Sequence, residues 1–236
     1  ARGLLNGPLD YGFNYSYPLL RGNHSSPYAF FENDLLVGDP DDLILWGSGN
    51  YGCSEIVRDG IGMPYWDSCQ LGPVLTQKAI EFIDQHHQNN VAEGTNTPFF
   101  LYYASQSAHS PYTPPDFFQG EPVNGVTGMT PHTDMIYEID VALGWLIDAL
   151  EQRNLTNNTL IIFTSDNGGI PDEISFGHDA VGGLRGRKGT IWEGGHRVPF
   201  VAKWGDGTLA GSMIPPGTTS NQLIGVQDVA ATLAAL

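Results

Sequence analysis

With 236 residues, of which 41% are hydrophobic and 11% aromatic, the chain is long enough to bury a sizeable core, and its composition excludes a disordered protein. Its 26 Asp and Glu residues outnumber its 10 Lys and Arg residues, and the formal net charge of −16 excludes the broad basic surface that nucleic acid requires. No run approaches about eighteen apolar residues, and the N-terminus lacks a charged segment followed by an apolar stretch, so neither a membrane span nor a signal peptide is visible.

The first part of the chain, residues 1–72, is rich in Gly, Pro, Asp and Tyr, which predicts loops, short strands and a hairpin or two. Residues 47–52 match Gly-x-Gly-x-x-Gly, but no helix pattern follows to receive a pyrophosphate, so we interpret the motif as a loop. Cys53 and Cys69 are equally compatible with a disulfide and with two reduced thiols.

Residues 73–236 have the pattern of an α/β sheet core. The pattern predicts helices at residues 73–88, 131–150 and 223–236, and strands at residues 99–103, 159–165 and 198–204, the first two of them buried. The order strand, helix, strand predicts a right-handed crossover between two parallel strands. Residues soon after Tyr103 and soon after Ser165 are then expected at one edge of the sheet, where α/β proteins bind ligands.

A candidate cation site follows the strand at 159–165. Asp166 and Asn167 offer a carboxylate and an amide oxygen, which suit Ca²⁺ or Mg²⁺, and Gly168 and Gly169 let the backbone turn sharply. The same four residues are also typical of a turn that binds no ion. Two ligands, moreover, do not satisfy a cation that takes about six or more oxygens. Further carboxylates must therefore come from elsewhere.

A candidate anion site lies in the basic stretch further along. Four of the ten Lys and Arg residues fall within thirteen positions of this acidic chain, which favours an anionic substrate group: Arg185, Arg187, Lys188 and Arg197. The ammonium of Lys188 can bind a tetrahedral anion as a point charge, and we expect Glu193 to orient Lys188 or Arg197 through an ion pair. The alternative is a solvated loop.

His109 is the candidate acid or hydrogen-bond donor. It lies six residues beyond Tyr103, in a Pro-fixed loop at the expected edge of the sheet, where an imidazole can donate to an oxyanion or protonate a leaving group. A single histidine more often caps a loop or lies in solvent. Its position still favours it over the other candidates, which are His24, His86, His87 and His132.

Three segments taken together resemble the sulfatase family, and arylsulfatases in particular, in their order and spacing: residues 98–111, 160–168 and 184–199. The resemblance extends over nearly the whole chain. It implies an alkaline-phosphatase-like α/β fold, with a mostly parallel sheet flanked by helices. It also implies metal-assisted hydrolysis of sulfate monoesters, with Ca²⁺ preferred to Mg²⁺.

The resemblance also implies roles for individual residues. Asp166 and Asn167 match the positions of two Ca²⁺ ligands in that family. His109 matches the residue that contacts the sulfate or the leaving oxygen, and Lys188 matches the residue that binds the sulfate. The cation in such a site polarises the sulfate and holds the nucleophile.

The departures from the family are informative. The family's nucleophile is a formylglycine made from the first residue of a Cys/Ser-x-Pro-x-Arg motif, which this chain lacks, and the sequences around Cys53 and Cys69 do not match it. The early paired aspartates, a Lys-x-His motif and the C-terminal subdomain are also missing. We therefore expect residues 1–236 to be a partial sulfatase catalytic domain, incomplete at its N-terminus and inactive alone.

The resemblance implies a parent that is secreted, periplasmic or lysosomal, and that acts on a sulfated small molecule or a carbohydrate sulfate. Four glycosylation sequons matter only in a secreted eukaryotic product: Asn14, Asn23, Asn154 and Asn157. Two alternatives stay open at this point. One is a phosphate or phosphonate ester hydrolase of the same superfamily, and the other is a non-catalytic anion-binding protein.

Overall fold

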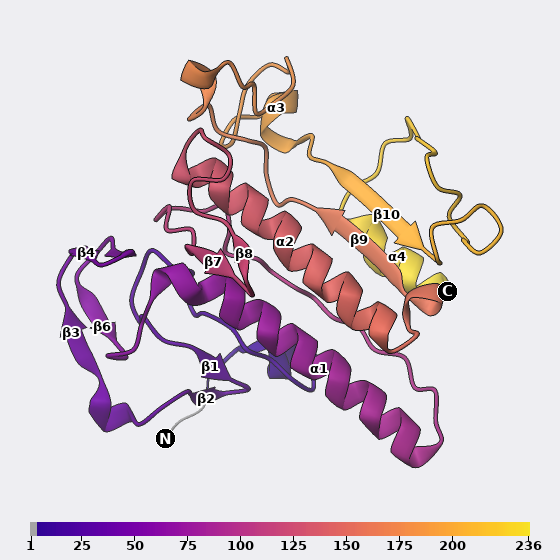
Figure 1. The fold of residues 1–236 in the computed structure, drawn as a ribbon, viewed down its shortest axis with the longest axis horizontal. Coiled ribbons are helices and arrows are strands. Elements are labelled where there is room, and N and C mark those ends of the chain that lie inside the picture. The colour runs from indigo at the N-terminus through magenta and orange to yellow at the C-terminus, as the bar shows by residue number, and fades with distance from the viewer. Residues whose placement is uncertain (1–3) are drawn as a thin grey trace. The chain divides into compact units, whose positions relative to one another are not determined.

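The computed structural model describes residues 4–236, so the first three residues of the predicted loop-rich segment lie outside the described residues. The chain forms two compact units (Figure 1). The first unit consists of Ala1–Asn154 and Asp166–Val198, and the second of Leu155–Ser165 and Pro199–Leu236. All four candidate site residues, His109, Asp166, Asn167 and Lys188, belong to the first unit.

The loop-rich part of the first unit contains the expected short hairpins. Three antiparallel pairs form, β1 (Phe31–Glu32) with β2 (Leu35–Leu36), β3 (Ile44–Trp46) with β6 (Gly60–Gly62), and β4 (Gly49–Tyr51) with β5 (Ser54–Ile56). The Gly-x-Gly-x-x-Gly motif at 47–52 covers the connection from β3 to β4, strand β4 itself and the turn after it, so only part of it is a loop. The element after β4 is a strand, so the motif has no helix to receive a pyrophosphate.

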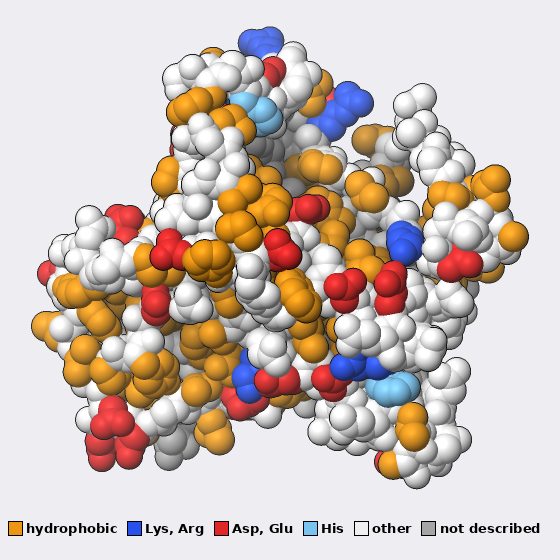
Figure 2. All heavy atoms as spheres, in the orientation of Figure 1, with side chains coloured by type: hydrophobic (Ala, Val, Ile, Leu, Met, Phe, Trp, Pro, Cys, Tyr) orange, Lys and Arg blue, Asp and Glu red, His pale blue; other side chains and the backbone are white. Residues whose placement is uncertain are grey.

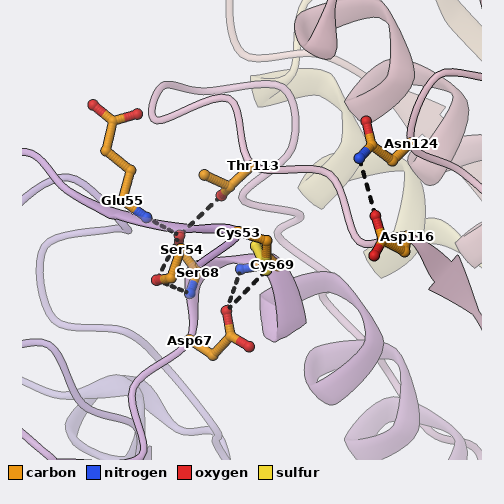
Figure 3. The surroundings of a disulfide bond; sticks show 9 residues. All are labelled: Cys53, Ser54, Glu55, Asp67, Ser68, Cys69, Thr113, Asp116 and Asn124. Carbon is orange, nitrogen blue, oxygen red and sulfur yellow. Dashed lines mark hydrogen bonds between the residues drawn. A yellow bond between two sulfur atoms is a disulfide. The ribbon is translucent and has the colours of Figure 1, made fainter. Parts of the chain in front are cut away.

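Cys53 and Cys69 form a disulfide, with their Cα atoms 6.2 Å apart. A buried network of hydroxyl groups lies beside it (Figure 3). Ser54 Oγ lies 3.1 Å from Ser68 Oγ, and Thr113 donates to Ser68 Oγ at 3.0 Å. Because Thr113 lies four residues beyond His109, this network anchors one end of the loop that carries the candidate histidine.

The two long helices of the first unit lie side by side (Figure 1). Helix α1 (Leu71–Glu93) is longer than predicted, and α2 (Pro131–Gln152) begins as predicted, with Thr130 capping it by accepting a hydrogen bond from the Thr133 amide. Gly72 faces Glu138, and Asp84 forms an ion pair with Arg153, so the two helices run in the same direction.

Shorter elements complete the first unit. They are the hairpin β7 (Phe117–Phe118) and β8 (Glu121–Pro122), helix α3 (Glu193–His196), and 3-10 helices at Pro8–Tyr11, Pro40–Asp42, Ser68–Gln70 and Ile174–Phe176. A hydrophobic core lies under the N-terminal hairpins and the start of α1, and its buried members are Tyr28, Phe30, Ile56, Trp66 and Leu71.

The predicted buried strand at residues 99–103 does not form. The segment has no regular secondary structure and pairs with no strand among residues 4–236, and Phe100 and Tyr102 are 58% and 72% exposed. Without this strand, the predicted parallel crossover is absent as well. A strand needs ladder hydrogen bonds from a neighbour, and the apolar pattern of the segment does not supply them.

The second unit contains the other two predicted strands. β9 (Leu160–Thr164) and β10 (Phe200–Trp204) pair antiparallel, with Thr164 opposite Phe200 and Leu160 opposite Trp204. All five residues of β9 are half-buried, so burial on both faces is not found. Helix α4 (Gln227–Ala235) is shorter than predicted, and a 3-10 helix at Thr156–Asn158 precedes β9. In the part of the chain that is described, no helix has the length and apolarity needed to cross a bilayer.

A buried carboxyl group lies between α1 and α2. The side chain of Glu138 is buried, and its Oε2 accepts a hydrogen bond of 2.9 Å from Ser107 Oγ. A Cβ atom at Gly72 would lie 1.7 Å from Glu138 Oε1, so only glycine at position 72 leaves room for the carboxyl group. Burial raises the pKa of Glu138 from 4.5 to about 7, although Ser107 and Gln106 oppose the increase.

This pKa makes stability depend on pH. Because the folded-state pKa lies above the ordinary value of 4.5, the folded protein binds more protons than the unfolded one between pH 4.5 and about 7. Stability should therefore fall as pH rises through this window, by on the order of 3 kcal/mol. Glu138→Gln should remove that loss in urea unfolding measured from pH 4 to 8. The exposed Glu151 on the same helix provides the control Glu151→Gln, and identical pH profiles of the two variants would contradict the prediction.

Candidate functional site

The loop at residues 166–169 brings the predicted cation ligands beside the predicted anion ligand. The Asp166 side chain is exposed and Asn167 is half-buried. The Gly168 amide donates to the Gly195 carbonyl at 3.0 Å, and the Lys188 amide donates to the Gly169 carbonyl at 3.0 Å. The backbone after Asp166 is therefore hydrogen-bonded directly to the loop that carries Lys188.

Glycines permit this close approach. A Cβ atom at Gly168 would lie 1.8 Å from the Gly194 carbonyl oxygen, and a Cβ atom at Gly195 would lie 2.1 Å from the Thr190 carbonyl oxygen. On the other side, a Cβ atom at Gly194 would lie 2.5 Å from the Gly186 carbonyl oxygen. Three backbone segments thus meet in a space that no side chain can enter.

The basic residues of this region have different surroundings. The Arg185 guanidinium lies 3.4 Å from the centre of the Trp192 ring, and Glu193 lies 3.8 Å from Arg197. Glu193 thus pairs with Arg197, one of its two expected partners. Lys188 is exposed and has no ion pair within residues 4–236, so its ammonium is available to an anion. Figure 2 shows Lys and Arg side chains near the top of the view, where Figure 1 draws α3, and Asp and Glu spread over the rest of this face.

His109 is an exposed side chain in the loop before Pro111. Its Nδ1 lies 2.8 Å from the Ser110 carbonyl oxygen, and because a carbonyl only accepts, Nδ1 carries the hydrogen. Nε2 is then the ring atom available to a substrate. The imidazole of His24 stacks on that of His109 with ring centroids 4.8 Å apart, and Asn23 donates to the His109 carbonyl at 3.3 Å.

A hydrogen bond joins the segment after His109 to the segment after Asp166. Tyr112 Oη donates to Asp172 Oδ2 at 3.0 Å. The next residue, Glu173, is buried and accepts hydrogen bonds from His132 Nδ1 at 2.6 Å and from Thr130 Oγ1 at 3.0 Å. Burial raises the pKa of the Glu173 carboxyl, but these two hydrogen bonds outweigh burial and hold its pKa below the ordinary range.

The structure therefore brings together the Asp166–Asn167 turn and the Lys188 loop, and connects the His109 loop to them through Tyr112 and Asp172. Within residues 4–236, no hydrogen bond or ion pair joins the His109 side chain to Asp166 or Lys188. Sequence reasoning ranked His24 and His132 below His109. No periodicity or motif predicted the contacts of these two histidines, because His24 stacks on His109 and His132 bonds to Glu173, and both partners are distant in the sequence.

The donor chemistry of the Asp166–Asn167 turn fits a hard cation in part. The Asp166 carboxylate is exposed and has no hydrogen bond or ion pair among the described residues, and carboxylate and amide oxygens are the ligands that Ca²⁺ takes. In residues 4–236, the one set of three ligand-type atoms within 4.8 Å of one another comes from Cys53, Asp67 and Cys69, whose sulfurs form the disulfide. Asp166 and Asn167 thus offer two oxygen atoms of the kind a hard cation takes, which is fewer than a complete coordination shell needs.

Comparison with known proteins identifies the family. The sulfatase family model matches residues 38–236, which include the two long helices, the Asp166 loop and the Lys188 loop. The chain therefore belongs to the sulfatase family. The solved sulfatase structures that it resembles have the alkaline-phosphatase-like α/β fold, and the chain has this fold in the form of a mixed α/β arrangement with small sheets.

The curated relatives are sulfatases of animals and bacteria. The chain is 29% identical over 231 residues to an N-acetylgalactosamine-6-O-sulfatase of Bacteroides thetaiotaomicron, with 82% of this chain and 43% of that protein covered. It is 40% identical over 146 residues to arylsulfatase A of Bos taurus, with 61% of this chain and 26% of that protein covered. The chain thus spans less than half the length of these relatives.

Two solved structures support the fold. One comes from work on the metabolism of multiple glycosaminoglycans by Bacteroides thetaiotaomicron, with a TM-score of 0.69, 26% identity, and coverage of 84% of this chain and 47% of that chain. The other is Ps i-CgsB in complex with k-i-k-neocarrahexaose, with a TM-score of 0.66, 24% identity, and coverage of 97% of this chain and 46% of that chain.

The glycine contact yields a prediction. Gly168→Ala places a methyl group 1.8 Å from the Gly194 carbonyl oxygen, so the two loops must separate, and we expect the free energy of unfolding to fall by about 1–3 kcal/mol. The matched control is Gly144→Ala, because Gly144 is exposed on α2 and its added Cβ meets nothing within 4 Å. That change should be neutral or stabilise by up to about 1 kcal/mol. Urea unfolding measures both, and equal stability of the two variants would contradict the prediction.

Proposed function

We propose that the protein hydrolyses sulfate monoesters. The observation that carries this proposal is the hydrogen-bonded contact between the Asp166–Gly169 turn and the Lys188 loop, within a chain of the sulfatase family. This contact places a candidate cation ligand and an unpaired ammonium on adjacent loops of an acidic protein. A sulfate group needs positive charge from both sources, because charge builds on its oxygens as the ester bond breaks.

Lys188 and His109 take different parts in this reaction. The Lys188 ammonium binds a sulfate oxygen as a point charge, since it is exposed and has no ion pair within the described residues. His109 Nε2 faces the leaving oxygen and gives it a proton, because Nδ1 is already engaged by the Ser110 carbonyl. Hydrolysis of the ester by water then yields an alcohol or phenol and inorganic sulfate.

Asp166 and Asn167 hold a divalent cation, Ca²⁺ in preference to Mg²⁺. Their oxygens suit the flexible, oxygen-rich coordination of Ca²⁺ better than the compact octahedron of Mg²⁺. When bound, the cation supplies Lewis-acid charge at the sulfate. The other ligands come from residues outside this chain.

The nucleophile, a formylglycine in our proposal, also comes from outside this chain. Both cysteines are joined in the disulfide, and neither is followed by Pro and Arg at the spacing that the modification requires. We therefore expect these 236 residues alone to show no turnover of sulfate esters.

The substrate in this proposal is a sulfated small molecule or a carbohydrate sulfate. The relatives favour this class, because one is an N-acetylgalactosamine-6-O-sulfatase and another an arylsulfatase A. The disulfide supports a secreted, periplasmic or lysosomal location, since disulfides persist in oxidising compartments. A glycan on Asn23 would displace the hydrogen bond from its buried side chain to the His109 carbonyl.

The role of Lys188 can be tested by its removal. In the full-length protein, Lys188→Ala should lower the kcat for an aryl sulfate by about 10²- to 10³-fold, because a charge that stabilises the transition state is lost. The control is Lys78→Ala, which removes an ammonium that pairs with Glu32 and Glu81 at the surface and should leave turnover unchanged. Unchanged turnover in Lys188→Ala would refute the assignment.

The cation site is tested by calorimetry, which does not depend on turnover. Asp166→Ala in the full-length protein should weaken Ca²⁺ binding by at least about tenfold, because one charged ligand is lost. Asp148→Ala removes an equally exposed carboxylate from α2 and should leave the affinity unchanged. The same affinity in all three proteins would remove Asp166 from the metal site.

A further inference from the structure

The segment Asn23–His24 contacts His109 in two ways. The two imidazole rings stack with centroids 4.8 Å apart and an interplanar angle of 29°. Asn23, which is 2% exposed, donates its Nδ2 to the His109 carbonyl across 86 positions of sequence. A buried side chain and a ring contact therefore hold the same residue from a distant part of the chain.

These contacts limit the motion of the His109 side chain. The backbone is held by Asn23 and by the hydrogen bond from the His109 amide to the Gln106 carbonyl, 3.0 Å long. One edge of the ring is held by the Ser110 carbonyl at Nδ1. An exposed imidazole with one hydrogen bond can still tilt about that edge. The face of His24 opposes this tilt and leaves Nε2 free.

We propose that His24 is a positioning residue for His109, whose stacked ring fixes the plane in which His109 Nε2 meets the leaving oxygen of a sulfate ester. The proposal rests on the proposed function. It goes beyond the roles of Lys188 and His109, because His24 acts only through His109. Small errors in the placement of a catalytic group are costly, since about 1 Å of displacement can lower a rate by about 10²-fold.

The electrostatics of the pair agree with this geometry. Burial lowers the pKa of the His24 imidazole, and His109 and Arg58 lower it further. The uncharged form of the His24 ring is therefore favoured. A neutral ring is a better neighbour for a protonated His109 than a second cation, because two stacked imidazolium ions would repel each other.

The test uses the full-length protein, two substrates and two substitutions. An alkyl sulfate has a poor leaving group that depends on protonation, whereas an activated aryl sulfate depends on it little. His24→Ala should lower the kcat for the alkyl sulfate by about tenfold to a hundredfold, with a smaller loss for the aryl sulfate and an unchanged KM. His24→Phe keeps a ring to stack on His109, so it should restore most of the kcat.

The control is His86→Ala. His86 also has an aromatic neighbour, Phe99 at 5.3 Å, but it lies on α1 and binds the Thr97 carbonyl, so its removal should leave both rates unchanged. Equal losses on the two substrates, wild-type kcat in His24→Ala, or a Phe variant as impaired as the Ala variant would each overturn the role of His24. Thermal unfolding of each variant identifies a loss caused by misfolding, and the Phe variant then decides the outcome. An inactive full-length wild-type protein would overturn the proposed function instead.

Discussion

The close contact of glycine backbones is the constraint on which the rest of the site depends. Gly168 approaches Gly194 and Gly195 so closely that a methyl group would overlap a carbonyl oxygen, and the amide of Gly168 bonds to Gly195. The same approach lets the Lys188 amide reach the Gly169 carbonyl. Two loops that carry opposite charges are thereby fixed by their backbones, while the side chains of Asp166 and Lys188 stay exposed.

A second connection ties this pair of loops to the helices. Glu173 accepts hydrogen bonds from His132 and Thr130 at the start of α2, and the adjacent Asp172 accepts one from Tyr112 in the His109 loop. A buried carboxylate with charged or strongly polar partners is costly to separate from them. The segment after Asp166 is therefore attached to the start of α2 through Glu173. The His109 loop is attached to the same segment through Tyr112 and Asp172, so these hydrogen bonds hold the two loops near each other.

The sequence predicted the local elements better than the pairing of strands. The helix at Thr130–Pro131 and the strands near 160 and 200 formed as expected, because caps and apolar periodicity are local signals. Residues 99–103 did not become a strand, since pairing depends on a neighbour that periodicity cannot reveal. The shared sheet edge expected for the His109 and Asp166 loops does not form, because residues 99–103 pair with no described strand; the hydrogen bond from Tyr112 to Asp172 joins the two segments instead. The contact between His24 and His109 was not predicted, because the two residues lie far apart in the sequence.

Lys188 differs from two other basic residues of this region in having no charged or aromatic partner among the described residues. Arg185 lies over Trp192 and Arg197 pairs with Glu193, so both have neighbours of their own. Within residues 4–236, Lys188 and Asp166 are each exposed and neither has an ion-pair partner, although their loops are hydrogen-bonded to each other. If the two charges existed only for stability, the simplest arrangement would be an ion pair between them. A backbone that brings their loops together leaves both charged groups without an ion-pair partner in the described part of the chain, which supports our proposal that the carboxylate binds a cation and the ammonium binds the sulfate.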